Sequence, residues 1–269
     1  MEQYFKWCIK RGGKLSTRLE KMGNRKKVRG KITVALIGMA VLMFGNCLTA
    51  AGNGGEISII RKEYINERMG NDIQVCYPQI QGLDDEEKEK RINYQIRKDA
   101  IKLVSGDEYK TACGIDYEIK LFNGEIISVC YKGLWGGIAK GQGLESAILT
   151  TTVDIEAGKV LRLKDVVTDF DTLCEMLIED GFEGITKWDG VAGNTVSQKY
   201  GYPKQSLGWI KERMIEGWIP PDATNFDWYT DGSRFVIVIS KWNTYDEFAI
   251  DLSEVEDILD SEFLEKLGR

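Results

Sequence analysis

The sequence predicts an α+β fold, with a mostly antiparallel sheet built from local hairpins, packed helices, and one N-terminal transmembrane or signal helix ahead of them. Three observations lead to this prediction. β-rich runs occur in pairs around short turns such as Asn123-Gly124 and Asp231-Gly232. Segments with apolar residues at helical spacing lie between those pairs. An uncharged, largely apolar run extends from Ile32 to Gly55.

The apolar run is long enough to cross a membrane. A helix rises about 1.5 Å per residue and a bilayer core is roughly 30 Å thick, so about 20 residues span it. The segment that begins at Ile32 and ends at Ala51 meets this length. Residues 1–31 carry eleven basic and two acidic residues, whereas the remaining chain carries 25 basic and 40 acidic ones. Because basic flanks stay in the cytoplasm, we expect a single-pass protein of the cell membrane whose acidic C-terminal part, of net charge −15, lies outside.

Two alternatives remain open at this end of the chain. The small residues from Leu48 to Gly52 also suit a signal peptidase, and cleavage would release the acidic part as a secreted protein. Translation from Met22 in place of Met1 would leave a shorter basic leader. We expect four segments: a short basic cytoplasmic segment (1–31), the transmembrane or signal helix (32–51), and two parts (56–140 and 141–269) that pack as one unit.

The elements of the acidic part follow from turn residues and apolar spacing. The helix start is the clearest of them, because Asp84 to Glu87 place carboxylates at the positive end of a helix dipole. A late helix is expected after Ser253, which is a suitable N-cap. The expected order is strands at 56–64 and 72–79, a helix at 84–104, a hairpin at 111–132, strands at 147–153 and 160–163, helices at 170–180 and 205–217, a hairpin at 226–239, an edge strand at 248–252, and the closing helix.

The hairpin around Asn123-Gly124 has two possible registers. A two-residue turn would place Ile119 opposite Ser128, whereas a three-residue loop with Gly124 in the left-handed region places Ile119 opposite Ile127. We favour the second, because it puts apolar partners on one face.

The cysteines outside the membrane are Cys76, Cys113, Cys130 and Cys174, and their spacing fits no metal or redox motif. In the favoured register Cys113 and Cys130 point to opposite faces, and Cys76 points away from the apolar face of its own strand. The hypothesised disulfide is therefore Cys76 with Cys130, with buried free thiols as the alternative.

A glycine-rich stretch runs from Gly133 to Gly143. It precedes a β-rich segment and not a helix, and it lacks a G-K-[ST] ending, so it does not indicate a phosphate site. We interpret it as a long loop that contacts a partner. The candidate partner-binding residues are Trp135, Gly136, Gly137 and Lys140.

The chain contains no histidine. This absence excludes Ser-His-Asp and Cys-His nucleophile activation and zinc sites built on imidazoles. We therefore expect no catalytic residues, no cofactor and no metal site. One hydrolytic chemistry that needs no histidine uses two carboxylates to cleave glycans, and its candidates here are Asp227, Asp231 and Asp246.

Several segments, in this order, resemble two families of unknown function. Tyr77-Pro78-Gln79-Ile80, with Gly82-Leu83 and the helix through Ile92-Asn93, resembles the opening of family DUF4163. The run from Thr150 to Val167 and the final hairpin from Phe226 to Leu252 resemble the companion family DUF3298. This pair forms the exported part of RsiV-like anti-sigma factors, which sense lysozyme by binding it, and the leader of peptidoglycan deacetylases such as PdaC.

The resemblance implies a non-catalytic binding or sensing module at a bacterial cell surface, with lysozyme, another envelope protein or peptidoglycan as its partner. Related sequences tend to carry a histidine near Ile138-Ala139-Lys140, which this chain lacks. The cytoplasmic segment is short and interrupted by Gly12-Gly13, so a sigma factor is not expected as a partner. Nucleic acid is not expected as a partner either, because the basic residues of the leader are interpreted as the signal that sets membrane orientation.

Overall fold

The computed structural model describes residues 49–51, 56–66, 73–104, 111–137, 145–179, 181–186, 194–202, 206–216, 224–241 and 244–269. They belong to one compact unit, Gly45–Arg269. Most of the predicted apolar span lies outside these residues, but its last three form strand β1 (Thr49–Ala51). Within the described ranges, no helix combines the length and apolar character needed to cross a membrane.

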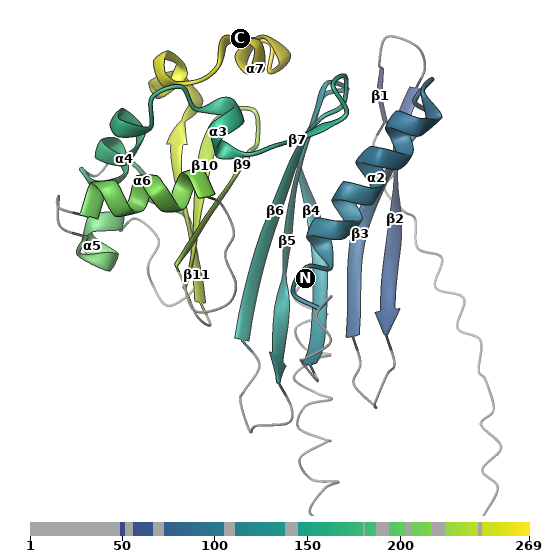
Figure 1. The fold of residues 1–269 in the computed structure, drawn as a ribbon, viewed down its shortest axis with the longest axis horizontal. Helices are drawn as coiled ribbons and strands as arrows, with labels where there is room; N and C mark the ends of the chain where they lie inside the picture. Colours follow the sequence, from purple (N-terminus) through teal and green to yellow (C-terminus); the bar gives the residue numbers. More distant parts are fainter. Residues whose placement is uncertain are drawn as a thin grey trace, which may run out of the picture. The chain divides into compact units, whose positions relative to one another are not determined.

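The first half of the unit is a seven-stranded sheet with its strands in chain order (Figure 1). Neighbouring strands are antiparallel except β3 and β4, which are parallel because a helix connects them. The sheet continues past the predicted division at residue 140. After β1 its strands are β2 (Glu56–Asn66), β3 (Ile73–Gln81), β4 (Thr111–Phe122), β5 (Ile126–Gly137), β6 (Glu145–Asp154) and β7 (Lys159–Leu161).

Helix α2 (Glu86–Ala100) covers one face of this sheet (Figure 1). It begins where the acidic cluster predicts, and the Asp85 carboxylate accepts a hydrogen bond of 3.0 Å from the Lys88 backbone N–H. Ile92, Ile96 and Ala100 face the sheet and are fully buried. The apolar spacing read from the sequence is confirmed over these residues.

Asn93 on α2 fixes the helix to strand β3. Its amide nitrogen donates to the Ile80 carbonyl oxygen and its Oδ1 accepts from the Ile80 N–H, both at 2.8 Å. The β3–β4 ladder joins only residues 73–75 of β3 to β4. Asn93 therefore supplies the hydrogen bonds that a neighbouring strand would otherwise make with the buried Ile80.

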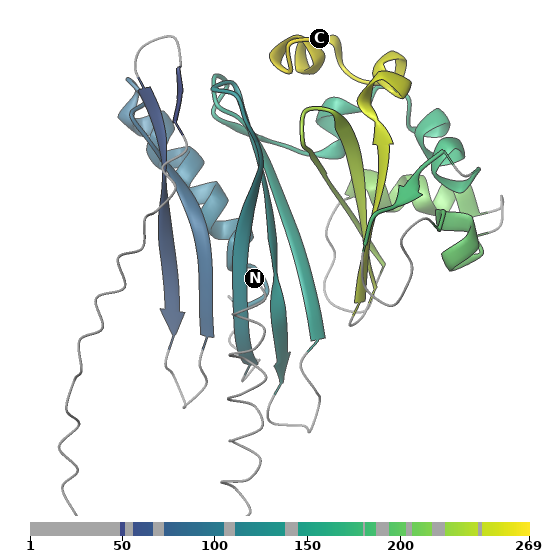
Figure 2. The same ribbon diagram turned by 180° about the vertical axis from the view of Figure 1, so that it is seen from behind.

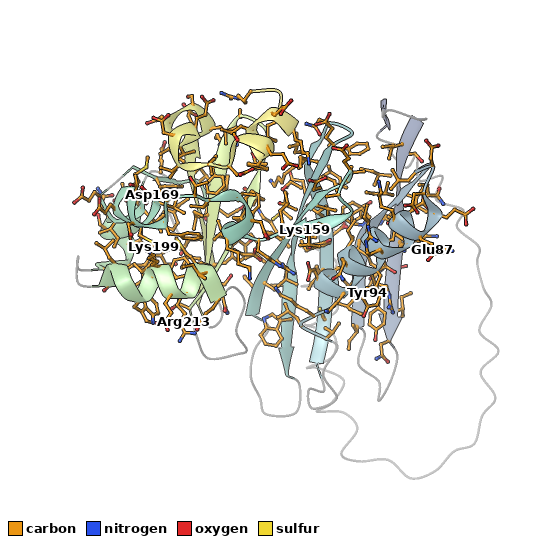
Figure 3. The ribbon with its side chains drawn as sticks, turned by 45° about the horizontal axis from the view of Figure 1, so that its top comes forward. Glu87, Tyr94, Lys159, Asp169, Lys199 and Arg213 are labelled. Atoms are coloured by element: carbon orange, nitrogen blue, oxygen red, sulfur yellow. The ribbon has the colours of Figure 1, made fainter. Side chains whose placement is uncertain are left out.

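We expect Asn93→Ala to lower the free energy of unfolding by about 1–3 kcal/mol, because the buried Ile80 N–H and C=O both lose their partner. Denaturant unfolding followed by circular dichroism measures this. Tyr94→Ala is the control, since Tyr94 is the next residue on the helix and its side chain is exposed (Figure 3). Equal stability losses in the two variants would contradict the bridging role of Asn93.

The second half is a four-stranded antiparallel sheet in the order β8-β11-β10-β9. Helices cover one of its faces and bury Leu173, Ile210, Phe235 and Phe248. The elements are α3 (Leu163–Val166), α4 (Phe170–Ile178), β8 (Glu183–Gly184), α5 (Val196–Tyr200), α6 (Leu207–Glu216), β9 (Asn225–Thr230), β10 (Arg234–Lys241), β11 (Thr244–Asp251), the 3-10 turns η4 (Leu252–Glu254) and η5 (Glu256–Ile258), and α7 (Ser261–Lys266).

Two sequence predictions at the C-terminal end are wrong. Strand β11 is not an edge strand, because the short β8 pairs with it at Phe248. Ser253 does not cap a helix, since the chain first makes the 3-10 turns η4 and η5. Asp260 is the cap of α7, and its carboxylate accepts from the Phe263 N–H at 3.1 Å.

The two sheets pack against each other through their remaining faces, so the unit has the layer order helix, sheet, sheet, helices (Figures 1 and 2). Figure 3 shows this order from another side, with Tyr94 of α2 on one flank and Lys199 and Arg213 of the opposite helices on the other. The contact between the sheets buries Cys130, Ile148, Tyr229, Val236, Val238, Tyr245 and Ala249. The unit therefore has three apolar clusters, one beneath α2, one between the sheets and one beneath the helices of the second half.

The β4–β5 hairpin has the predicted faces but not the predicted register. Ile119 lies opposite Val129, whereas the favoured prediction placed it opposite Ile127. The ladder shifts between Ile119 and Leu121, so Lys120 forms a bulge. The loop consists of residues 123–125. The Asn123 side-chain oxygen accepts hydrogen bonds from the Glu125 and Ile126 N–H groups. Gly124 has a φ of 94°, in the left-handed region. A two-residue shift keeps Ile119 on the predicted face, so alternation alone could not detect it.

The structure contradicts the Cys76–Cys130 disulfide, because both residues are buried free thiols. They do share the sheet face predicted for them, opposite to Cys113. However, Cys76 lies on β3 and Cys130 on β5, with β4 between them. Strands are about 4.8 Å apart, which separates the two Cα atoms by more than the roughly 7 Å that a disulfide tolerates. Burial raises the pKa of Cys76 to about 11 and that of Cys130 to about 12, so both remain thiols at neutral pH.

Candidate functional site

The predicted partner-binding loop is partly a strand. Trp135, Gly136 and Gly137 belong to β5 and pair with Cys113, Ala112 and Thr111 of β4. Trp135 is half-buried against the core beneath α2. Lys140 lies outside the described residues. The prediction of a loop is wrong for residues 133–137, because Gly133 lies in a strand where its missing side chain lets β5 approach β4 closely.

The three carboxylates considered for glycan cleavage do not converge. Asp227 lies on the face of β9 that meets the first sheet, and Asp246 lies on the opposite, helix-covered face of β11. Lys199 and the Tyr200 hydroxyl both donate hydrogen bonds to the Asp246 carboxylate. Asp231 lies in the β9–β10 loop and binds Ser233 and Arg234. The two-carboxylate mechanism requires a pair of carboxylates on either side of one substrate bond, and these three are not arranged in that way.

Asp231 instead stabilises the β9–β10 hairpin. Its Oδ2 accepts hydrogen bonds from the Arg234 guanidinium at 2.9 and 2.6 Å. Burial acts to raise the pKa of Asp231, but the hydrogen bonds from Ser233 and Arg234 outweigh it, so the pKa lies below its usual value. A carboxyl group with a lower pKa in the folded state contributes stability above its unfolded pKa, and this stability is lost as the pH falls through the folded value.

We expect Asp231→Asn to lower the free energy of unfolding at pH 7 by about 1–2 kcal/mol, because the charged bond to Arg234 is lost. The difference from the unchanged protein should shrink below about pH 4, where the unfolded-state carboxyl becomes protonated. Urea unfolding at pH 7, 5 and 3 measures both effects. Asp257→Asn, on an exposed part of η5, controls for the loss of one negative charge. A stability difference that is independent of pH would contradict the assignment.

The main candidate site is a cavity of about 350 Å³ where the two halves of the unit meet. It lies between the C-terminal end of α2, the start of α3, the end of α6 and strand β9. Its walls combine three cations, three carboxylates and an apolar group of side chains. The lining residues are Asp99, Lys102, Arg162, Leu163, Lys164, Met214, Ile215, Glu216, Phe226, Asp227 and Trp228.

The acidic side chains of the cavity are held by the protein itself. Asp99 is buried, and its Oδ2 accepts a hydrogen bond from the Thr151 hydroxyl at 3.2 Å. Asp227 accepts from the backbone N–H groups of Thr150, at 3.3 Å, and Trp228, at 3.0 Å. The hydrogen bond from the Thr150 N–H of β6 to the Asp227 carboxylate of β9 also joins the two sheets beside the cavity.

Arg162 and Lys102 are two of the cations that line the cavity. The Arg162 guanidinium lies 3.6 Å from Asp99 Oδ2, longer than a hydrogen bond, and its side chain is 47% exposed. Burial lowers the pKa of Lys102, although the charges of Asp227 and Asp99 act to raise it. The loss of hydration at this ammonium group thus exceeds the compensation from its carboxylate neighbours.

Sequence reasoning did not identify this cavity. Its residues come from four segments between positions 99 and 228, and none of them forms a short motif. The nearest signal was Arg162-Leu163-Lys164, where two cations flank a buried leucine. Among the described residues, no group of histidine, cysteine and carboxylate side chains could hold a metal ion.

The negative charge is concentrated at the C-terminal end of the unit. The segment from β11's last residue through α7 carries seven carboxylates before its first cation, Lys266. Lys266 bonds Asp154 and Glu262, and Arg269 bonds Glu256. The exposed carboxylates of this acidic surface are Asp251, Glu254, Asp257, Glu262 and Glu265.

No protein-family model matches the chain, and no curated protein matches it. Among solved structures it is similar to a member of the DUF3298 family from Bacteroides fragilis, with a TM-score of 0.47, 12% sequence identity, and coverage of 81% of this chain and 98% of that one. It is also similar to a DUF3298 family protein from Pseudomonas aeruginosa, with a TM-score of 0.40, 8% identity, and coverage of 78% and 95%. Both neighbours thus belong to one of the two families that the sequence resembles.

Proposed function

We propose that the chain is a non-catalytic, RsiV-like binding module outside a bacterial membrane, anchored by the segment from Ile32 to Ala51, and that it recognises a basic envelope protein such as lysozyme. The observation that carries this proposal is the charge of residues 32–269, which hold 25 basic and 40 acidic residues. A surface of one sign accelerates encounter with a partner of the other sign.

The acidic surface of the C-terminal segment supports the proposal further. Glu254 and Asp257 are exposed on the 3-10 turns η4 and η5, whose backbone is held against the core by buried Leu252, Val255 and Ile258. Rigid presentation of carboxylates lowers the entropy cost of pairing them with cations on a partner.

The experiment uses the compact unit, residues 45–269, immobilised for surface plasmon resonance with lysozyme as the basic probe. We expect saturable binding whose association rate falls at least tenfold between 0.05 and 0.5 M salt, since screening shortens the reach of the surface charge. The double variant Glu254→Lys with Asp257→Lys should slow association several-fold. Glu175→Lys with Glu183→Lys, two exposed carboxylates on α4 and β8, is the matched control and should slow it less.

Two outcomes would contradict the proposal. One is the absence of saturable lysozyme binding, with capture of the unit by peptidoglycan sacculi in its place. The other is a carboxyl-terminal reporter that proves to be cytoplasmic in a bacterial host, because the proposed partner is met only outside the membrane.

A further inference from the structure

The cavity between α2, α3, α6 and β9 has the size of a small-molecule site. Ligand pockets typically enclose about 300–1,000 Å³, are mostly apolar, and hold a few placed polar groups. This cavity has about 350 Å³ and is more polar than most such pockets, since six ionisable side chains face one apolar wall. Its place at the meeting of the two sheets also matches the usual location of ligand sites between structural units.

The polar wall favours an anion. Asp99 Oδ2 accepts from Thr151, and the two Asp227 oxygens accept from Thr150 and Trp228, so three of these four carboxylate oxygens already have a donor within the protein. Arg162 forms an ion pair with Asp99 at 3.6 Å, which is longer than a hydrogen bond, and its side chain is half-exposed. A guanidinium in this state can turn its two parallel N–H groups to a carboxylate ligand.

The apolar wall favours a ligand with a hydrocarbon part. Phe226 and Met214 are buried in it. Ile215 is 40% exposed at the cavity, although large aliphatic side chains are usually buried. A hydrocarbon group placed against Ile215 would remove this side chain from water, which is favourable.

We propose that this cavity binds a small organic carboxylate that carries an apolar side chain, of the size of an N-acylated amino acid, with its carboxylate on Arg162 and its side chain against Ile215 and Phe226. The partly exposed Lys102, which also lines the cavity, supports this assignment. Burial lowers its pKa, and a carboxylate in the cavity would stabilise its charged form. The site lies apart from the exposed carboxylates of the acidic surface, and it is independent of whether the module binds a basic protein.

The test is titration calorimetry of the full-length protein with N-acetyl-leucine, with N-acetyl-leucinamide and acetate as comparison ligands. We expect saturable binding of N-acetyl-leucine and at least tenfold weaker binding of the other two, which lack the charge and the side chain respectively. Arg162→Gln should weaken N-acetyl-leucine binding at least tenfold, and Ile215→Ser several-fold. Lys90→Gln, on an exposed part of α2 away from the cavity, should leave binding unchanged.

The variants can be checked for folding, since Arg162 and Ile215 are partly exposed and their replacement should leave the thermal midpoint nearly unchanged. Equal affinity for the acid and the amide would overturn the proposal, as would full affinity in folded Arg162→Gln protein. Binding of inorganic phosphate or acetate as tightly as N-acetyl-leucine would also overturn it, because the site would then be a simple anion site. Failure of lysozyme binding, measured separately, would leave these results unaffected.

Discussion

Gly133→Ala is expected to lower the free energy of unfolding by about 3 kcal/mol or more, which is enough to unfold many small domains. A Cβ atom on Gly133 would lie 2.0 Å from the Gly114 carbonyl oxygen and 2.7 Å from the Ile115 Cα atom. Both are backbone atoms of the paired strand β4, so they cannot move aside as a flexible side chain would. The clash can be relieved only by separating β4 from β5 at the centre of the sheet.

The matched control for this substitution is Gly208→Ala. Gly208 lies in helix α6, and its Cβ would have no atom within 4 Å. Alanine is the better helix former, so this variant should be as stable as the original or more stable by up to about 1 kcal/mol. Thermal and urea unfolding of both variants provide the comparison. A Gly133→Ala protein within about 1 kcal/mol of the original would show that the two strands can separate at little cost.

Lys132→Met is the second substitution with a large expected effect, a loss of about 3–5 kcal/mol. The Lys132 ammonium group donates to both Glu247 oxygens, at 2.8 and 2.7 Å, across the interface between the sheets. The Glu247 side chain is only 6% exposed, and it also accepts from the Tyr229 hydroxyl at 2.8 Å. Without Lys132, the Glu247 carboxylate would be buried with no cation, and water could not replace it.

A second substitution separates the buried charge from other causes of instability. Adding Glu247→Gln to Lys132→Met removes the uncompensated carboxylate, so the double variant should regain at least half of the lost stability. Lys90→Met is the control, since the Lys90–Glu87 pair is exposed and should contribute less than about 1 kcal/mol. A double variant less stable than Lys132→Met alone would contradict this explanation.

The sequence predicted strands and helices well where the cap, turn or apolar pattern that defines an element lies within that element's own segment. The carboxylates before α2, the turn at Asp231-Gly232 and the continuous apolar run of β10 each led to an element that the structure contains. These signals are local, because a cap, a turn or a period-2 pattern involves residues within a few positions.

The errors arose where two distant segments decide the outcome. Gly133 was interpreted as part of a loop, but it lets β5 lie close to β4, which a single segment cannot reveal. The disulfide hypothesis used sheet faces correctly, yet it lacked the strand order that separates Cys76 from Cys130. The hairpin register depended on a bulge at Lys120, which keeps Ile119 on the predicted face but places Leu121 on the opposite one, and an alternating pattern does not predict where a bulge falls.

By itself, the sequence determined the charge asymmetry along the chain, the α+β class and the chemistry that the absence of histidine excludes. These are properties of composition and of short-range pattern, so they need no knowledge of which segments meet. Only the tertiary structure decided the order of the strands, the pairing of Lys132 with Glu247 and the cavity that joins Asp99, Arg162 and Asp227. The physical reason is that packing and electrostatic pairing act through space, and residues more than a hundred positions apart become neighbours only when the two sheets bury their shared face.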